Sequence, residues 1–544
     1  MKTVKSSQKT FPTTLFILAC ILVFAGIMRV YQLATLPATL NRDEAALAYN
    51  ALLLQQAGKD EWGRAWPIAL ESFGDYKLPG YPYILVIFFQ LFGVNDFAVR
   101  LPSALAGTIL VGLSYIFARR VLLLESVTSL LVAAGVAIQP VFFFYSRMAW
   151  EANVGLMFFV TGVICFLSPT DTAKQLFSRK DVLGLLFCLL AILTYNTPLL
   201  LLPFLGVAIM LRRGLKQWKS WRVAVSGLAI LFLVGIVTFS SISQQKSSIT
   251  IFNDETNWRE SVIYYESFSG LQQKLFGNRY VFYAKVIIEQ YVESWSPLFL
   301  IQKGGSHPWH NLPGKGHLLV MSYGFALISL LRLLWLSINP NTDRSQRPII
   351  WAVLFLLLTS LFPSVITVDA PHATRSLFFF FMLCVTGGIS LEWMWHIVSR
   401  ENDNKRALQT IYSLMILFAV LNQSYVYYSY YFSKYPTESA VILKAGLNTA
   451  VAKLENELRD NDDQVAVVDP DGFWYVTVAW GMKMPADQFF ATVNHHLPDR
   501  IGLKYGYRVG RYRFIVDRDD RVEEDKKIIE WSSPTKQWVI NNNL

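Results

Sequence analysis

Residues 41–63 read NRDEAALAYNALLLQQAGKDEWG, and the stretch closes at residues 73–77 with FGDYK. It is charged and aromatic, and it follows the first long apolar run of the chain, residues 12–33. Only 16% of all residues are charged, yet two carboxylates, Asp43 and Glu44, stand side by side here. We therefore take this stretch as the first candidate for chemistry.

The same stretch contains the signals of a helix with defined ends. Asn41 and Glu44 have the N-cap and N3 spacing of a capping box, and Gly58 is a typical terminator. We predict a helix over residues 42–57. Its leucines and alanines favour a helix that lies on a membrane surface.

The composition places this stretch in a membrane protein. Of the 544 residues, 53% are hydrophobic, the mean hydropathy is +0.35, and the apolar residues fall in long blocks. A soluble domain of this size is excluded, and we predict a polytopic, all-α membrane protein. The formal charge of +10 is typical of Lys and Arg held at the cytoplasmic face, so nucleic-acid binding is not expected.

A spanning helix needs roughly 20 apolar residues, or somewhat fewer where neighbours shield it. On this rule we predict about eleven transmembrane helices. They lie near residues 12–33, 98–118, 121–141, 154–168, 182–195, 198–211, 222–242, 317–336, 349–366, 376–397 and 408–430. Lys and Arg then fall in alternate loops, which predicts a cytoplasmic N-terminus and an extracytoplasmic C-terminal tail.

This topology divides the chain into a transmembrane module, residues 1–430, and an extracytoplasmic α/β domain, residues 431–544. Within the module, residues 34–97 form a first outer loop and residues 243–316 a large outer loop. In the tail, we predict a helix followed by short strands. The helix covers residues 438–458, and the strands cover residues 465–468, 474–478, 513–516 and 538–540.

Asp43 and Glu44 are the first candidate catalytic residues. Neighbours on a helix point about 100° apart, so the two carboxylates cannot act as a matched pair on one atom. One can face a cavity while the other caps the helix. Partial burial is expected to raise the proton affinity of the first and suit it as a general base toward a hydroxyl. The alternative is that both carboxylates merely stabilise the helix N-terminus.

Two further candidates lie in the outer loops near this stretch. Arg147 and Glu151 have the spacing of a salt bridge on a helix surface, which is their structural alternative. The residues alone slightly favour that salt bridge, and only their predicted position, at a helix end on the same face as Asp43, counts against it. Lys77 follows Asp75 and is either a solvated charge or a ligand of an anion.

The loop before the span at 376–397 carries His372 and Arg375. An arginine at the outer end of a span opposes the positive-inside rule, which indicates an anionic partner: either Asp369 or a phosphate, which arginine binds with two donors. His307 and His310 lie in the large outer loop. Their spacing does not fit a zinc site, and we predict a loop that lines a pocket.

Several motifs together resemble the GT-C glycosyltransferases that use polyprenyl-phosphate sugars, in particular the protein O-mannosyltransferase and aminoarabinose-transferase group. The resemblance covers most of residues 12–430. It rests on five motifs: DE at 43–44, GDYKLP at 74–79, FGVNDFAVRLPSALAG at 92–107, YSR at 145–147 with Glu151, and PHATR at 371–375.

The resemblance implies an inverting enzyme of the cell membrane, acting in protein glycosylation or on the cell envelope, with a site open to the extracytoplasmic side. Asp43 would be the base, with Glu44 and Glu151 as further acids. The lipid phosphate would be bound by Lys77, Arg147, His372 and Arg375, with His307 and His310 on a pocket loop. The implied partners are a polyprenyl-phosphate sugar donor, a protein, lipid or glycan acceptor, and membrane lipids. Neither a cofactor nor a metal is expected.

A different class of function remains open. A polytopic protein can also be a transporter, or a flippase for a lipid-linked sugar, and charged residues within spans are the usual marker of such carriers. Here the predicted spans are nearly free of Asp and Glu, and the charges lie in the outer loops. This distribution favours an enzyme over a carrier. A scaffold whose tail binds partners is a third possibility.

Overall fold

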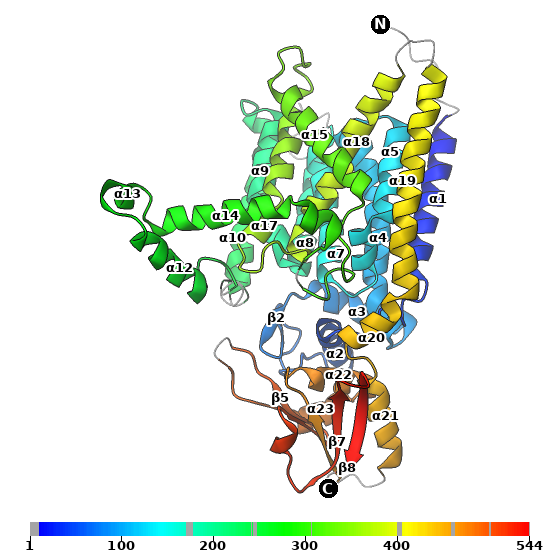
Figure 1. Ribbon diagram of the computed structural model, residues 1–544, viewed down its shortest axis with the longest axis vertical. Coiled ribbons are helices and arrows are strands. Elements are labelled where there is room, and N and C mark those ends of the chain that lie inside the picture. The colour runs from blue at the N-terminus through cyan, green and yellow to red at the C-terminus, as the bar shows by residue number, and fades with distance from the viewer. Residues whose placement is uncertain are drawn as a thin grey trace. The chain divides into compact units, whose positions relative to one another are not determined.

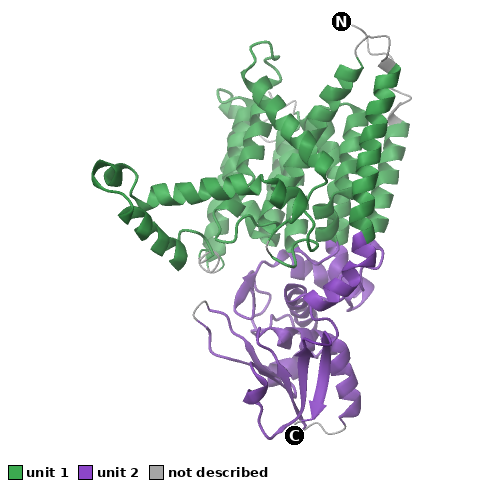
Figure 2. Cartoon of the chain, in the orientation of Figure 1, with its two compact units in different colours: residues 1–29, 104–146, 151–429 green, residues 30–103, 147–150, 430–544 purple. Residues whose placement is uncertain are grey.

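The structure is a computed structural model. It describes residues 10–169, 178–240, 242, 247, 249–305, 307–399, 405–458, 463–499 and 502–542. The chain forms two compact units (Figure 2). Unit 1 comprises residues 1–29, 104–146 and 151–429, and unit 2 comprises residues 30–103, 147–150 and 430–544. Three predicted cytoplasmic segments, residues 1–9, 170–177 and 400–404, lie outside the described residues.

Unit 1 is helical (Figure 1). The apolar runs of the sequence form these helices because a helix satisfies all its backbone polar groups internally, as a membrane requires. The α-helices that make up the unit, wholly or in most of their length, are α1 (Thr10–Val30), α4 (Asp96–Ile116), α5 (Ser126–Ile138), α6 (Pro140–Ser146), α7 (Glu151–Leu167), α8 (Arg179–Thr194), α9 (Asn196–Arg213), α10 (Trp218–Thr238), α12 (Glu255–Glu266), α13 (Gly270–Leu275), α14 (Arg279–Ser294), α15 (Val320–Ile338), α16 (Arg347–Thr359), α17 (Phe362–Val365), α18 (Leu377–Val398) and α19 (Lys405–Ser433).

The structure places a helix at each of the eleven predicted spans. Among the described residues, seven helices are long and apolar enough to cross a membrane, or eight if the bent pair α5 and α6 is one span. The chain is therefore a multi-span membrane protein, while the number eleven stays a prediction. The predicted break between the fifth and sixth spans is confirmed, since α8 ends at Thr194 and α9 begins at Asn196.

Unit 2 combines the predicted first outer loop with the C-terminal region. Its first part holds α2 (Arg42–Ala57), the hairpin of β1 (Leu70–Ser72) and β2 (Asp75–Lys77), and α3 (Gly80–Phe92). Its C-terminal part holds α20 (Tyr435–Ile442), α21 (Leu447–Glu457), β3 (Gln464–Val468), α22 (Trp474–Met482), α23 (Ala486–Thr492), β4 (Asn494–His495), β5 (Gly506–Val509), β6 (Tyr512–Ile515), β7 (Asp525–Ser532) and β8 (Gln537–Asn542). The predicted domains are two consecutive stretches that meet at 430/431. Unit 2 instead combines segments from before and after this boundary.

Helix α2 confirms the predicted helix over residues 42–57 and the residues predicted to begin and end it. Asn41 accepts a hydrogen bond from the backbone of Glu44, Glu44 accepts one from the backbone of Asn41, and Gly58 ends the helix at φ 65°. Every residue from 44 to 54 is buried in the protein, so the leucines of the helix pack against protein, and the expected position on a membrane surface stays a prediction. The helix packs against α3 and α22 within unit 2.

The C-terminal sheet has the order β4-β5-β6-β3-β7-β8, and β3 runs parallel to both β6 and β7. The strands predicted at 465–468, 513–516 and 538–540 are confirmed as β3, β6 and β8. The strand predicted at 474–478 is wrong, because these residues begin α22. The predicted helix 438–458 is two helices, α20 and α21, separated at Gly446, whose φ is 104°.

Candidate functional site

The first candidate cluster is an ion triad in unit 2. Asp43 lies in the first turn of α2, and β2 carries Asp75 and Lys77. The Lys77 ammonium is 2.9 Å from an Asp43 carboxylate oxygen and 3.0 Å from one of Asp75. The Asp43 side chain is 22% exposed and that of Lys77 13%. The predicted catalytic acid and the predicted phosphate ligand are therefore in direct contact, and both reach the surface.

The charge state of Asp43 corrects one expectation. Burial on its own raises the pKa of the Asp43 carboxyl, but the Lys77 ammonium and the Arg42 guanidinium outweigh it, and the pKa lies below its ordinary value. The expected rise in proton affinity is therefore wrong for the triad as it stands. Asp43 is therefore an anion, and its pKa depends on how close the Lys77 ammonium lies.

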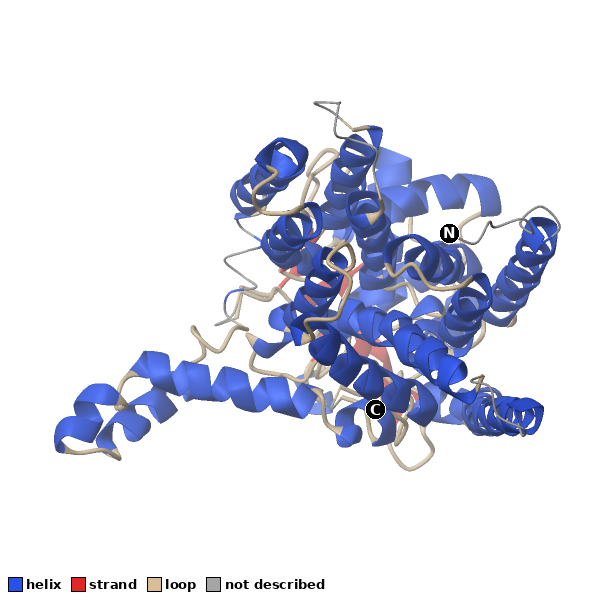
Figure 3. Cartoon of the chain, turned by 90° about the horizontal axis from the view of Figure 1, so that it is seen from above, coloured by secondary structure: helices blue, strands red, loops and turns tan. Residues whose placement is uncertain are grey.

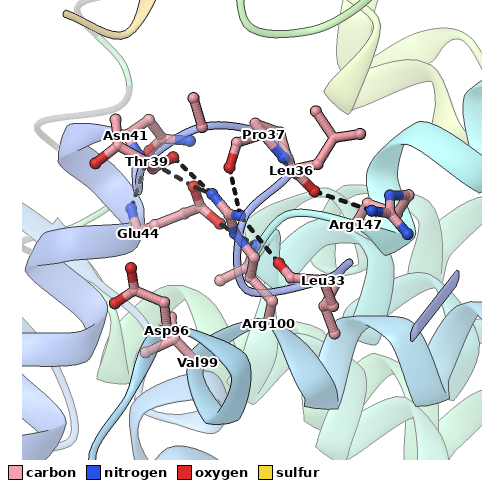
Figure 4. Close-up of polar contacts among 12 residues, drawn as sticks. Leu33, Leu36, Pro37, Thr39, Asn41, Glu44, Asp96, Val99, Arg100 and Arg147 are labelled. Atoms are coloured by element: carbon pink, nitrogen blue, oxygen red, sulfur yellow. Dashed lines mark hydrogen bonds and ion pairs between the residues drawn. The ribbon is translucent and has the colours of Figure 1, made fainter. Parts of the chain in front are cut away.

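Glu44, one residue further, is a buried structural group (Figure 4). Its carboxylate is 3.0 Å from Nε of Arg100, a side chain with no exposed surface, and it accepts a hydrogen bond of 2.7 Å from the backbone of Ala149. Arg100 also donates to three backbone carbonyls, those of Leu33, Pro37 and Thr39. Glu44 thus completes a buried network that fixes the chain between α1 and α2. A catalytic role for it stays a prediction.

Arg147 holds the same connecting segment from the other side. It is fully buried and donates to the Tyr431 hydroxyl at 2.8 Å and to the backbone carbonyl of Leu36 at 3.1 Å. It lies in a turn before α7, so it does not share a helix with Glu151, the first residue of α7. The surface pair suggested by their spacing is therefore not formed on one helix. The role of Arg147 at a lipid phosphate stays a prediction.

A buried carboxyl that the sequence analysis did not single out holds the hairpin that carries Lys77. Glu61 is 2% exposed and accepts hydrogen bonds from the backbone of Phe73 and the hydroxyl of Tyr475, both at 2.8 Å. The backbone of Lys504 donates to the Phe73 carbonyl. The hairpin tip is thereby fastened to the C-terminal part of unit 2. No local motif marks Glu61; its role follows from burial alone.

Glu61 also gives a pH prediction. Burial raises its pKa from 4.5 to about 7, and its hydrogen bonds offset this only in part. A raised folded-state pKa means that the folded protein binds the proton more tightly, so its contribution to stability is full below pH 4.5 and is lost as pH rises through 7. We expect the loss to be roughly 3 kcal/mol.

The measurement is thermal or chemical unfolding from pH 4.5 to 8, taken as the difference between the wild type and Glu61→Gln, since other carboxyls cancel in that difference. The wild type should lose stability relative to the variant across this range. A difference that does not change with pH would contradict the raised pKa.

The second candidate cluster lies in unit 1. Arg375 forms an ion pair with Asp369 and donates to the Thr367 hydroxyl at 2.8 Å. Nε2 of His372 is 3.4 Å from the same Asp369 carboxylate. Of the two partners that the sequence left open for Arg375, the structure contains Asp369, whose side chain is 43% exposed. Because Asp369 is exposed, a phosphate could replace it as the partner of Arg375. Phosphate binding by Arg375 therefore stays a prediction.

Both histidines of the large outer loop join this cluster. The rings of His307 and His310 stack with centroids 4.2 Å apart, and His310 meets His372 at 4.6 Å. The Asn311 side chain orders the loop by donating to the carbonyls of Lys303, Leu312 and Lys315. Burial, with the nearby Arg375 cation, holds the pKa of His372 well below its usual value. His372 is therefore neutral at pH 7, and Arg375 supplies the positive charge.

The structure thus brings the predicted residues together in two groups. Asp43 and Lys77 meet in unit 2, with Glu44 and Arg147 in a network beside α2, and His307, His310, His372 and Arg375 meet in unit 1. Glu151 begins α7 in unit 1 and is buried. Arg100, the buried partner of Glu44, was not singled out from the sequence, although an arginine inside the apolar motif 92–107 was a visible signal. Among the described residues, no group of three or more His, Cys, Asp or Glu has the arrangement of a metal site.

Comparison with known proteins supports one class. Residues 77–238 match the family described as dolichyl-phosphate-mannose-protein mannosyltransferase. No curated protein sequence matches the chain. The two solved structures compared here are both under 25% identical, so their likeness concerns the fold.

The first is the archaeal oligosaccharyltransferase AglB from Archaeoglobus fulgidus, solved with an inhibitory peptide and a dolichol-phosphate. It is 12% identical, has a TM-score of 0.54, and is matched over 87% of this chain and 64% of its own. The second is ArnT from Cupriavidus metallidurans bound to undecaprenyl phosphate, 15% identical, with a TM-score of 0.50 and coverage of 87% and 84%. The chain thus spans less than two thirds of AglB.

The two structural likenesses agree with the predicted GT-C fold, and residues 77–238 resemble the mannosyltransferase family. The small C-terminal domain with a sheet is also confirmed.

Proposed function

We propose that the protein transfers a sugar from a polyprenyl-phosphate donor to a hydroxyl of an acceptor on the extracytoplasmic side of the cell membrane. One observation carries the proposal: the partly exposed Asp43 and Lys77 pair, on a fold shared with a protein solved with undecaprenyl phosphate. The description of the matching family favours a protein as acceptor. A lipid or glycan acceptor is the alternative.

Lys77 links the two halves of the proposed reaction. In the triad, it neutralises Asp43 and Asp75. When the donor phosphate binds, the ammonium contacts its oxygens, and Asp43 loses the stronger of the two cations that lower its pKa. The carboxylate then becomes a better base toward the acceptor hydroxyl. Donor binding would in this way activate the base only when there is a sugar to transfer.

Transfer then proceeds with inversion at the anomeric carbon. Asp43 takes the hydroxyl proton, the oxygen forms the new glycosidic bond, and the bond to the phosphate oxygen breaks, so that polyprenyl phosphate leaves. Lys77 stabilises the growing negative charge of the leaving phosphate. Such donors are worth about 10²- to 10³-fold in rate each, and the reaction as proposed uses no metal.

The competing function is movement of a lipid-linked sugar across the membrane without a chemical change. Its usual marker is an acidic or basic residue within the spans. Asp43, Asp75 and Lys77 instead lie in the segment between α1 and α4, at the start of a helix and in a hairpin. A carrier has no need of such an ion triad there.

The test uses purified protein in liposomes that contain a polyprenyl-phosphate sugar and an acceptor peptide rich in serine and threonine. Release of polyprenyl phosphate, with sugar gained by the acceptor, is the expected result. Release of polyprenyl phosphate without a modified peptide would support the enzyme and exclude this acceptor. Movement of the intact donor between leaflets, without release, would identify a flippase and overturn the proposal.

A further inference from the structure

Helices α12, α13 and α14 form an arm that extends sideways from the other helices of unit 1 (Figures 1 and 3). This segment belongs to the predicted large outer loop, residues 243–316, for which no helices were predicted. A small buried cluster packs Phe282 and Tyr283, in the first turns of α14, against Ile251. Much of the remaining surface of α14 is exposed in the described chain.

The uncovered surface of α14 has two different sides. One row, four residues apart, is apolar: Tyr280, Ile288 and Val292 are 71%, 62% and 64% exposed, and Ala284 completes the row. The adjacent row is charged and consists of Lys285, Glu289 and Glu293. Lys285 and Glu289 pair across one turn at 3.8 Å. Leu271 of α13 and Trp258 of α12 are also more than half exposed.

One hydrogen bond fixes the arm relative to a membrane span. The Tyr291 hydroxyl of α14 donates to the backbone carbonyl of Leu358, at 3.0 Å. Leu358 lies one residue before the end of α16, within the candidate span Arg347–Val365 that α16 and α17 form together. The end of that span leads into the loop with His372. The arm therefore joins the span at a depth where a bilayer is still apolar.

We propose that the arm lies in the plane of the membrane, embedded in the outer leaflet. Its apolar row faces acyl chains, and its charged row faces headgroups and water. An amphipathic helix in a bilayer interface has this division, and exposed Trp258, Tyr265 and Tyr280 are the residue types enriched at that level. The depth given by Tyr291 selects lipid over a soluble partner, because a soluble protein does not reach this level.

The experiment places nitroxide labels on matched positions of the full-length protein in liposomes. The four native cysteines (Cys20, Cys165, Cys188 and Cys384) are first replaced by alanine. Ile288→Cys and Glu289→Cys then carry the label on the two rows of one helix turn. Leu331→Cys in the span α15, 67% exposed, is the lipid reference, and Asp519→Cys in the tail is the water reference. Collision rates with oxygen and with a water-soluble nickel chelate are measured by electron paramagnetic resonance.

We expect the ratio of oxygen to nickel collisions at position 288 to match that at 331 and to exceed that at 289 several-fold. A nickel-accessible label at 288, similar to that at 519, would overturn the proposal in favour of an aqueous surface. A label at 288 shielded from both reagents, with shielding that weakens on dilution in lipid, would show a second copy of the chain on this face and overturn it equally. Sugar transfer by the labelled proteins is measured separately, so a failure of the proposed enzyme function does not affect this result.

Discussion

Asp43→Asn is expected to reduce sugar transfer by at least about 100-fold while the protein stays folded, because it removes the base from the hydroxyl that attacks. The substitution keeps the size of the side chain. Lys77 retains Asp75 at 3.0 Å, so no buried charge is left alone. The measurement is initial rates of polyprenyl-phosphate release in liposomes, with unfolding temperature as the check on folding.

The matched control is Asp75→Asn, which removes the other carboxylate of the same lysine. Asp75 has no assigned contact with the acceptor, so its variant should change the donor KM more than kcat. Lys77→Ala should lower kcat, since the ammonium is assigned to the leaving phosphate. If Asp43→Asn turned over at a near-normal rate, Asp43 would not be the base and the mechanism would fail.

Glu44→Ala is expected to destabilise the protein by about 3–5 kcal/mol, the usual cost of leaving one member of a buried ion pair without its partner. Arg100 has no exposed surface and would keep its charge beside three carbonyls. The capping box of α2 would be lost as well. The measurement is thermal unfolding in detergent, alongside the yield of folded protein.

Glu71→Ala serves as the control for this loss. Glu71 is as buried as Glu44, at 2% exposure, but its partners Arg64 and Lys504 are 45% and 28% exposed and can be solvated when it is removed. We therefore expect a cost of only about 1 kcal/mol. A Glu44→Ala protein that is as stable as the wild type but inactive would instead support the catalytic role that the sequence suggested for Glu44.

The sequence was sufficient to predict those helices that are determined by residues close to each other in the chain. The helix 42–57 follows from Asn41, Glu44 and Gly58, which act within a few residues of each other. The apolar runs likewise predicted helices at the right places. The run WYVTV at 474–478 was misread because its aromatic and β-branched residues are typical of strands, whereas burial against neighbouring elements decides its conformation. Residues 475–480 are all buried as a helix.

The candidate site depends on contacts that spacing does not reveal. Asp43 and Lys77 are 34 residues apart, and their pairing reverses the pKa shift expected for Asp43 from burial alone. Burial raises the pKa of a carboxyl, and a nearby cation lowers it. The sign of the shift can therefore be predicted only when the distance to the cation is known. Tyr475 is still further from Glu61, and no sequence pattern links a tail tyrosine to a hairpin of the first loop.

The interleaved composition of unit 2 has a consequence for biosynthesis. Its first segment ends at residue 103, and its last begins at residue 430. At about 5–20 residues per second, synthesis of the intervening chain takes roughly 16–65 s. During that time Glu61 lacks Tyr475, and Arg147 lacks Tyr431. The hydrogen bonds that fasten the hairpin carrying Lys77 to the C-terminal region therefore form late, when the rest of the chain has already been synthesised.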